Sequence, residues 1–197
     1  MGLSRGRGAI APVLEGGAET GERVVTLRRG DVVRLRPIRP DDEAGLMSLY
    51  RRLSQHTAYQ RFFSVRPLRP EEAHAFAHVD YRERMAVVAE IDTDQGPTLI
   101  GVARYGPSSE ARTADVAFVV EDDWQGRGLG PVLLGEILRA GERRGINRFS
   151  ADVLADNRRM LHLLARDTSV IHRTTSDAIT HLIFRRRADD SPETEKS

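Results

Sequence analysis

The feature that most constrains the fold of this chain is a glycine-spaced segment between two runs of different periodicity. Residues 113–120 have the pattern of a strand, and residues 129–144 place leucine and isoleucine at helical spacing. Between them stands Gln125-Gly126-Arg127-Gly128-Leu129-Gly130. Glycine permits positive φ and a close approach of the backbone to a ligand. The first turn of a helix carries unpaired main-chain N–H groups, so the sequence predicts an anion site suited to phosphate.

Other phosphate-binding patterns fit this segment less well. The third glycine of the dinucleotide fingerprint would fall at residue 131, which is proline, and a parallel unit would have to precede the loop. A mononucleotide P-loop needs Gly-Lys-Ser or Gly-Lys-Thr, which is absent. A glycine-rich turn that only links strand to helix remains the alternative interpretation.

The flanking sequence predicts an α+β domain. Residues 24–27 and 32–38 alternate around a turn, and a helix is expected from Pro40 with Ala44, Met47, Tyr50 and Leu53 on one face. Short turns separate three later strand-like runs, which indicates an antiparallel meander. We expect a mixed, mostly antiparallel sheet of six to seven strands with about four to five helices. Further runs are expected as helices at 54–63, 70–80 and 157–166, and as strands at 85–91, 98–105, 149–154, 168–172 and 178–184.

Composition bounds the class of protein. The 30 basic and 29 acidic residues give a net charge of +1, which argues against a coat for nucleic acid or an anionic membrane. The chain has no cysteine, so disulfides, thiolate metal sites and a cysteine nucleophile are excluded. No apolar run approaches the roughly 20 residues of a membrane helix, and a cytoplasmic location is expected. We expect a flexible leader at 1–22, one domain at 23–187 and a flexible acidic tail at 188–197.

Two histidines show the spacing of a metal-binding helix face. His74 and His78 lie four residues apart on an expected helix. No third ligand is evident in the sequence, so no metal is expected. A Gly-x-Ser-x-Gly elbow is also absent, which leaves serine hydrolase chemistry without a nucleophile.

Three motifs give the chain a family resemblance. The spacing Gln-x-x-Gly-x-Gly at 125–130 resembles the acetyl-CoA pyrophosphate loop, motif A, of GNAT superfamily N-acetyltransferases. Asp156-Asn157-Arg158-Arg159-Met160 resembles the start of their motif B, and it would serve equally as a helix cap. Segments 36–42, 61–64 and 79–81 look like the bacterial protein-lysine acetyltransferase branch, which is Pat-like. The likeness covers approximately residues 24–184.

The resemblance implies a GNAT fold and direct transfer of acetyl from acetyl-CoA to an amine in a ternary complex. It implies acetyl-CoA as co-substrate, no metal, and a monomer or homodimer. Arg158 and Arg159 are further candidates for the phosphates. The cofactor-binding residues that it implies are Phe118, Val119, Val120, Gln125, Gly126, Arg127, Gly128, Leu129, Gly130 and Asn157.

The resemblance also implies a catalytic base. In the protein-acetylating branch a glutamate on the fourth strand takes this part, and here Asp115 stands in its place. Desolvation in an apolar strand would raise the pKa of this carboxyl, and its shorter side chain favours a bridging water. The alternative is an exposed aspartate at a strand start. Residues 157–167 also lack the tyrosine that many members use to reprotonate the leaving thiolate.

Three functions follow as hypotheses. The first is acetylation of a protein lysine, and the second is acetylation of a small amine. The third is a regulatory module that binds acetyl-CoA after losing its catalytic groups.

Overall fold

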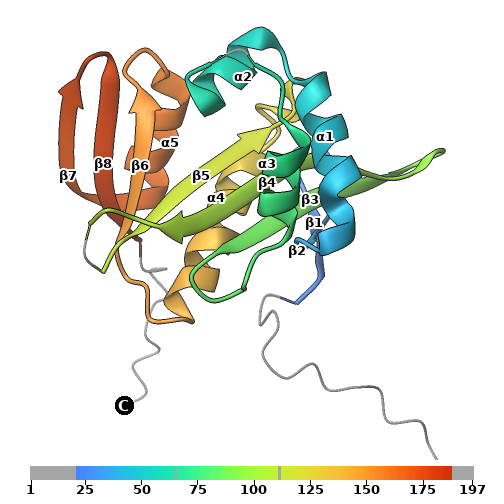
Figure 1. Cartoon of the computed structure of the whole chain (residues 1–197), viewed down its shortest axis with the longest axis horizontal. Coiled ribbons are helices and arrows are strands. Elements are labelled where there is room, and N and C mark those ends of the chain that lie inside the picture. Colours follow the sequence, from blue (N-terminus) through green and yellow to red (C-terminus); the bar gives the residue numbers. More distant parts are fainter. Residues whose placement is uncertain (1–20, 65, 111, 188–197) are drawn as a thin grey trace, which may run out of the picture.

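The computed structural model describes residues 21–64, 66–110 and 112–187, and within them one eight-stranded sheet carries the fold (Figure 1). Its order is β1-β2-β3-β4-β5-β6-β8-β7, and every neighbouring pair is antiparallel except β5 with β6. The predicted leader and tail lie almost wholly outside the described residues. The strands are β1 (Arg23–Thr26), β2 (Val32–Pro37), β3 (Met85–Thr93), β4 (Gly96–Pro107), β5 (Ala114–Val120), β6 (Phe149–Leu154), β7 (Thr168–Ser176) and β8 (Ile179–Arg186).

The described residues contain eight strands, one more than the predicted six to seven, and the predicted strand-turn-strand start is present as β1 and β2 at one edge of the sheet. Gly30 has φ +87° in the turn between them, and the amide of Leu27 donates to the carbonyl of Asp31 at 2.8 Å. Only glycine adopts this backbone conformation without strain. The α+β class and the single parallel step are as predicted.

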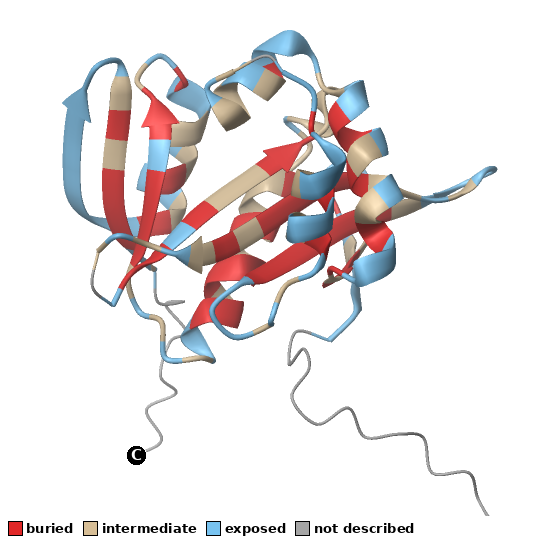
Figure 2. Ribbon diagram, viewed as in Figure 1, coloured by how far each residue is buried: buried red, intermediate tan, exposed pale blue. Residues whose placement is uncertain are grey.

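Helices cover both faces of the sheet. One apolar cluster joins α4 and α5 to the strands, and a second joins α1 and α3 to the opposite face. Figure 2 shows buried residues along the central strands and an exposed β7 at the edge. The helices are α1 (Glu43–Arg52), α2 (Gln55–Phe62), α3 (Pro70–Ala77), α4 (Leu129–Glu142) and α5 (Arg158–Asp167), with 3-10 turns at Pro40–Asp42 and Asp122–Trp124.

The predicted inner face of α1 was correct for Met47, Tyr50 and Leu53, which pack against the core, and wrong for Ala44. Ala44 is exposed, whereas Leu46 and Leu49 are fully buried beside Tyr50. The two leucines bury much more apolar surface than an alanine, and this decides which stripe of the helix faces the sheet.

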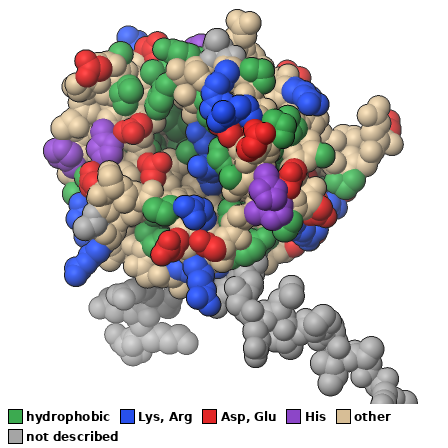
Figure 3. All heavy atoms as spheres, in the orientation of Figure 1, with side chains coloured by type: hydrophobic (Ala, Val, Ile, Leu, Met, Phe, Trp, Pro, Cys, Tyr) green, Lys and Arg blue, Asp and Glu red, His purple; other side chains and the backbone are tan. Residues whose placement is uncertain are grey.

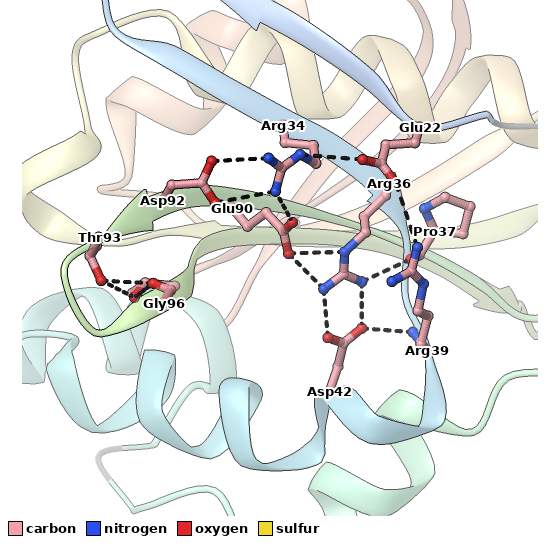
Figure 4. A network of polar contacts seen from close by, with 11 residues as sticks. Glu22, Arg34, Arg36, Pro37, Arg39, Asp42, Glu90, Asp92, Thr93 and Gly96 are labelled. Atoms are coloured by element: carbon pink, nitrogen blue, oxygen red, sulfur yellow. Dashed lines mark hydrogen bonds and ion pairs between the residues drawn. The ribbon is translucent and has the colours of Figure 1, made fainter.

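A buried ion network joins β2, β3 and the start of α1 (Figure 4). The guanidinium of Arg36 donates to both oxygens of Asp42 at 2.7 Å and to Glu90 at 2.7 Å. Arg34 donates to the other oxygen of Glu90 at 2.7 Å, and Asp42 accepts the main-chain amide of Arg39 at 2.7 Å. The segment 36–42, which carries part of the family resemblance, therefore has a structural role in this chain.

The central helix α4 packs on β3, β4 and β5, and its end approaches Phe149 of β6. Its predicted inner residues are all buried, namely Leu133, Leu134, Ile137 and Leu138. Near the end of the helix, a Cβ on Gly141 would lie 2.7 and 2.8 Å from ring carbons of Phe149. Such distances are too short for non-bonded carbons, so only glycine fits at position 141.

Gly141→Ala is expected to destabilise the fold by about 1–3 kcal/mol, because the added methyl must displace the buried Phe149 ring. Gly135→Ala is the matched control on the same helix, where the nearest atoms belong to the flexible Arg139 side chain at 3.5 Å. It should raise stability by up to about 1 kcal/mol through helix propensity. Urea unfolding of both variants checks this, and equal stabilities would contradict the packing described here.

Candidate functional site

The site forms where β5 and β6 diverge. β5 pairs with β4 along its whole length, but it pairs with β6 only at Ala114–Phe149 and Asp115–Ser150. A cavity of about 240 Å³ lies beside the unpaired part of β5 and is lined there by Phe118, Val119 and Val120. An unpaired strand edge can bind an extended ligand through its main chain.

The glycine loop lies at the mouth of this cavity. Gly126 and Gly128 have φ of +74° and +99°, and both line the cavity together with Gly130 and Pro131. No side chain caps the first turn of α4 in the described part of the chain. The arrangement fits a phosphate ligand, because uncapped main-chain donors at a 14-residue helix face an opening.

The side chain of Gln125 holds the loop in place. Its amide nitrogen donates to the hydroxyl of Thr57 on α2 and to the carbonyl of Val120, both at 3.1 Å. Its oxygen accepts from Arg159 of α5 at 2.7 Å. Gln125 lines the cavity, yet its hydrogen bonds connect three elements around the loop and leave ligand contact to neighbouring groups.

Arginines give the larger cavity a positive potential. Arg28, Arg61, Arg159 and Arg166 line it, and among the described residues no carboxylate side chain does. In the same part of the chain neither Arg28 nor Arg61 forms an ion pair, although the charge of Arg61 also acts on the carboxyl of Asp115. Such a lining suits an anionic ligand that carries several phosphates.

Sequence reasoning missed Arg28 and Arg61. Arg28 lies in the β1–β2 turn, and its Cγ would be 3.5 Å from a Cβ on Gly128. Arg61 ends α2. Arg28 stands 100 positions before Gly128 in the sequence, and Arg61 stands 64 positions before Gln125. No local pattern encodes proximity between residues so far apart.

Two predicted cofactor residues do not line the cavity. Arg127 lies over the ring of Trp124, at 4.7 Å from its centroid, and its guanidinium lies 3.3 Å from Asp31. Leu129 is fully buried in the core. Any contact of these two residues with a ligand falls to their main chain.

Asn157 caps a helix, as one of its two interpretations predicted, and it also lines the cavity. Its side-chain oxygen accepts the amide of Met160 at 3.1 Å and so caps α5. The residue is 7% exposed and lines the cavity, and its amide nitrogen has no hydrogen-bond partner among the described residues. Because this N–H₂ group is unpaired and opens to the cavity, it can donate to a ligand that supplies an acceptor.

A second cavity of about 140 Å³ adjoins the first. The two share lining residues from α2, β5 and α5, and Figure 3 shows a hollow on this face of the molecule. The smaller cavity contains two carboxylates, Asp115 and Asp152, which the larger one lacks. The shared lining residues are Gln60, Arg61, Phe118, Asn157 and Met160.

The predicted base Asp115 lies at the point of divergence, at the last pair between β5 and β6. The residue is exposed overall, but its carboxyl lies in the cavity, and partial desolvation raises its pKa. The negative charge of Asp152 raises the pKa further, whereas a 3.3 Å hydrogen bond from Ser150 and the charges of Arg61 and Arg104 lower it. The exposure of Asp115 agrees with the alternative interpretation, its raised pKa is of the kind expected for a base, and the catalytic role stays a prediction.

One group of three metal-type ligands occurs within the described residues, and it lies outside both cavities. Glu43 of α1 lies 2.8 Å from Nδ1 of His74 and 3.4 Å from Nδ1 of His78, which supplies the third side chain that the sequence did not reveal. The two imidazoles stack at 3.9 Å between centroids.

No helix in the described part is long and apolar enough to cross a membrane.

Comparison with known proteins points to one family. The profile described as "Acetyltransferase (GNAT) domain" matches residues 33–166. Acetyltransferase Pat of Mycolicibacterium smegmatis is 35% identical over 143 residues, which cover 72% of this chain and 42% of that protein. Acetyltransferase PA5475 of Pseudomonas aeruginosa is 30% identical over 76% of this chain and 87% of its own length. The crystal structure of the GNAT domain of S. lividans PAT superposes with a TM-score of 0.74 at 34% identity, over 83% of this chain and 96% of that one.

Proposed function

Since the chain belongs to the GNAT acetyltransferase family, whose co-substrate is acetyl-CoA, we propose that it acetylates the ε-amine of a lysine in a protein. The observation that carries this proposal is a pair of adjoining cavities that differ in charge, since four arginines line the larger one and Asp115 and Asp152 line the smaller one together with Arg61. The arginine-lined cavity suits the anionic cofactor, and the carboxylate-lined cavity suits a cationic amine. Both diverging strands line the smaller cavity, and β5 also lines the larger one.

The residues present fit acetyl-CoA. The main chain of 126–130 would hold the diphosphate, with Arg28 and Arg159 as neighbouring cations. The free edge of β5 and the unpaired amide of Asn157 would meet the amide-bearing arm of the cofactor. The loop and the arginines would thus match the phosphate charge at one end of the cavity. The strand edge would offer main-chain hydrogen bonds along its length.

The chemistry needs little from the protein beyond position and proton transfer. Acetyl-CoA supplies an activated acetyl group as a thioester. An alkyl ammonium has a pKa near 10.4 and must lose a proton before its nitrogen can attack. The carboxylate of Asp115 takes that proton, directly or through a water, and passes it to solvent. The neutral amine nitrogen then attacks the thioester carbonyl, the C–S bond breaks as the amide forms, the nitrogen gives its second proton to water, and the leaving thiolate takes up a proton from water.

The preference for a protein lysine rests on two supports. Segments 36–42, 61–64 and 79–81 resemble the Pat-like branch, and the relatives at 34–35% identity carry the name Pat. The smaller cavity of about 140 Å³ has room for an alkyl ammonium, while Asp115 and Asp152 remain exposed at its rim. A surface side chain from another protein reaches such a site more easily than it reaches a closed pocket.

Calorimetric titration with acetyl-CoA followed by a thiol-release screen tests the proposal. The screen compares lysine-bearing proteins and peptides with polyamines and aminoglycosides. We expect binding of acetyl-CoA, and release of thiol with lysine side chains at the highest kcat/KM. Release with small amines alone would overturn the choice of acceptor. Binding without release on any amine would indicate a regulatory module.

A further inference from the structure

We propose that Asp152, held in place by His181 and Glu110, is the acceptor-binding residue that selects a protonated primary amine in the smaller cavity. The inference rests on the proposed function, because it concerns the acceptor side of the same site. It gives Asp152, His181 and Glu110, which have no part in the transfer chemistry described above, a role in binding the acceptor.

The sheet brings the two carboxylates of the cavity onto one face. Asp115 is paired with Ser150 in the parallel step from β5 to β6, and Asp152 lies two residues farther along β6. Side chains two residues apart in a strand point to the same side. Both carboxylates consequently face the space where the strands diverge, and both line the smaller cavity.

The two carboxylates keep free acceptor capacity. The carboxyl of Asp115 accepts a long hydrogen bond of 3.3 Å at Oδ1 from the hydroxyl of Ser150. Asp152 uses Oδ1 for His181 at 2.7 Å. In the described part of the chain neither Oδ2 has a partner, and no arginine forms an ion pair with either residue. An ammonium carries three donors and could satisfy both oxygens at once.

His181 positions the second carboxylate. It stands opposite Asp152 in the pairing of β6 with β8, with Nδ1 on Asp152 and Nε2 at 3.1 Å from Glu110 of the β4–β5 loop. Contacts through both ring nitrogens fix the imidazole, and the imidazole then fixes the rotamer of Asp152. A side chain held in this way loses less entropy when an ammonium binds.

A second polar group in the same cavity supports a bound ligand there. Asn157 is 7% exposed and carries an amide nitrogen without a partner among the described residues. This nitrogen lies where the two cavities join, because Asn157 lines both. A donor beside two carboxylates matches a ligand with a carbonyl next to an amine, which is the arrangement at the moment of transfer.

The experiment compares two ligands that differ only in charge at the end of the same stem. Nα-acetyl-lysine methylamide carries the ε-ammonium, and Nα-acetyl-norleucine methylamide lacks it. Their dissociation constants are measured on the full chain with CoA present, so that no transfer takes place. We expect the lysine amide to bind about tenfold more tightly, and Asp152→Asn to remove this preference while acetyl-CoA affinity stays the same.

Three control variants distinguish the effect of the Asp152 charge from the effect of its positioning by His181. Asp177→Asn removes the same charge from the β7–β8 turn, outside both cavities, and should change neither constant. His181→Ala should raise the acceptor KM several-fold with kcat kept. His181→Asn retains a donor for Asp152 and should restore most of the wild-type KM.

The outcomes distinguish this inference from the proposed function. Equal binding of both amides, or an unchanged preference in Asp152→Asn, overturns the role of Asp152 even if lysine transfer is observed. Selective binding of the lysine amide without thiol release would support the ammonium site at Asp152 and overturn the proposal that the protein transfers acetyl to lysine.

Discussion

Gly128→Asp is expected to weaken acetyl-CoA binding about 100-fold. Gly128 has φ +99° at the start of α4, and a Cβ placed on it would point toward Arg28 at the cavity lining. A carboxylate there would repel the diphosphate and compete for Arg28. Two unit charges about 4 Å apart repel by on the order of 4 kcal/mol at an effective dielectric constant of 20. Screening by salt reduces this to about 2.7 kcal/mol, which corresponds to the stated loss.

Gly96→Asp is the matched control for this variant. Gly96 has φ +102°, nearly the same backbone conformation, in the β3–β4 turn and away from both cavities. Both variants should lose similar stability from the strained φ. Calorimetry should show wild-type acetyl-CoA affinity in Gly96→Asp, and an equal loss of affinity in the two variants would remove the special role of the loop.

Asp115→Asn is expected to lower kcat by about 100-fold to 10,000-fold with acetyl-CoA affinity unchanged. The side chain keeps its size but can no longer accept the proton of the acceptor amine, and general base catalysis typically contributes factors of this order. Steady-state thiol release and calorimetry measure the two quantities separately. A kcat within about threefold of wild type would mean that water alone, or another group, removes the proton.

The pH dependence gives an independent check of the base. Because the pKa of Asp115 is raised, kcat/KM should fall as the pH drops through a value above the ordinary aspartate pKa. The active form is the carboxylate, so activity lies on the high-pH side of this limb. Asp152→Asn removes a repulsive charge and should shift the limb to lower pH. Asp115→Asn should lack the limb altogether.

Local patterns predicted much of the scaffold. The inner face of α4 was predicted residue by residue, because leucine and isoleucine recur at helical spacing over 14 residues. The glycine loop was predicted because strand, glycines and helix follow one another directly in the chain. Ala44 shows where the pattern was ambiguous, since α1 offers two partly apolar stripes and tertiary packing selects one.

The charged parts of the site could not be predicted in the same way. Arg28 and Arg61 approach the loop from distant segments, and Asp152 meets His181 only because β8 returns beside β6. Nothing in the sequence around Asp152 distinguishes it from a surface aspartate in a strand. The divergence of β5 and β6 also follows from the whole sheet, because a strand pairing that stops after two residues leaves no local pattern.

Amide spectra of the ¹⁵N-labelled full chain test the central claim most directly. Titration with acetyl-CoA is compared with S-acetyl-pantetheine, which carries the same acetyl arm without the diphosphate. Main-chain N–H groups that donate to phosphate should shift downfield, and we expect the largest shifts at Gly126, Gly128 and Gly130 with acetyl-CoA only. Equal shifts with both ligands, or shifts elsewhere with these three amides unmoved, would contradict a diphosphate held by this loop.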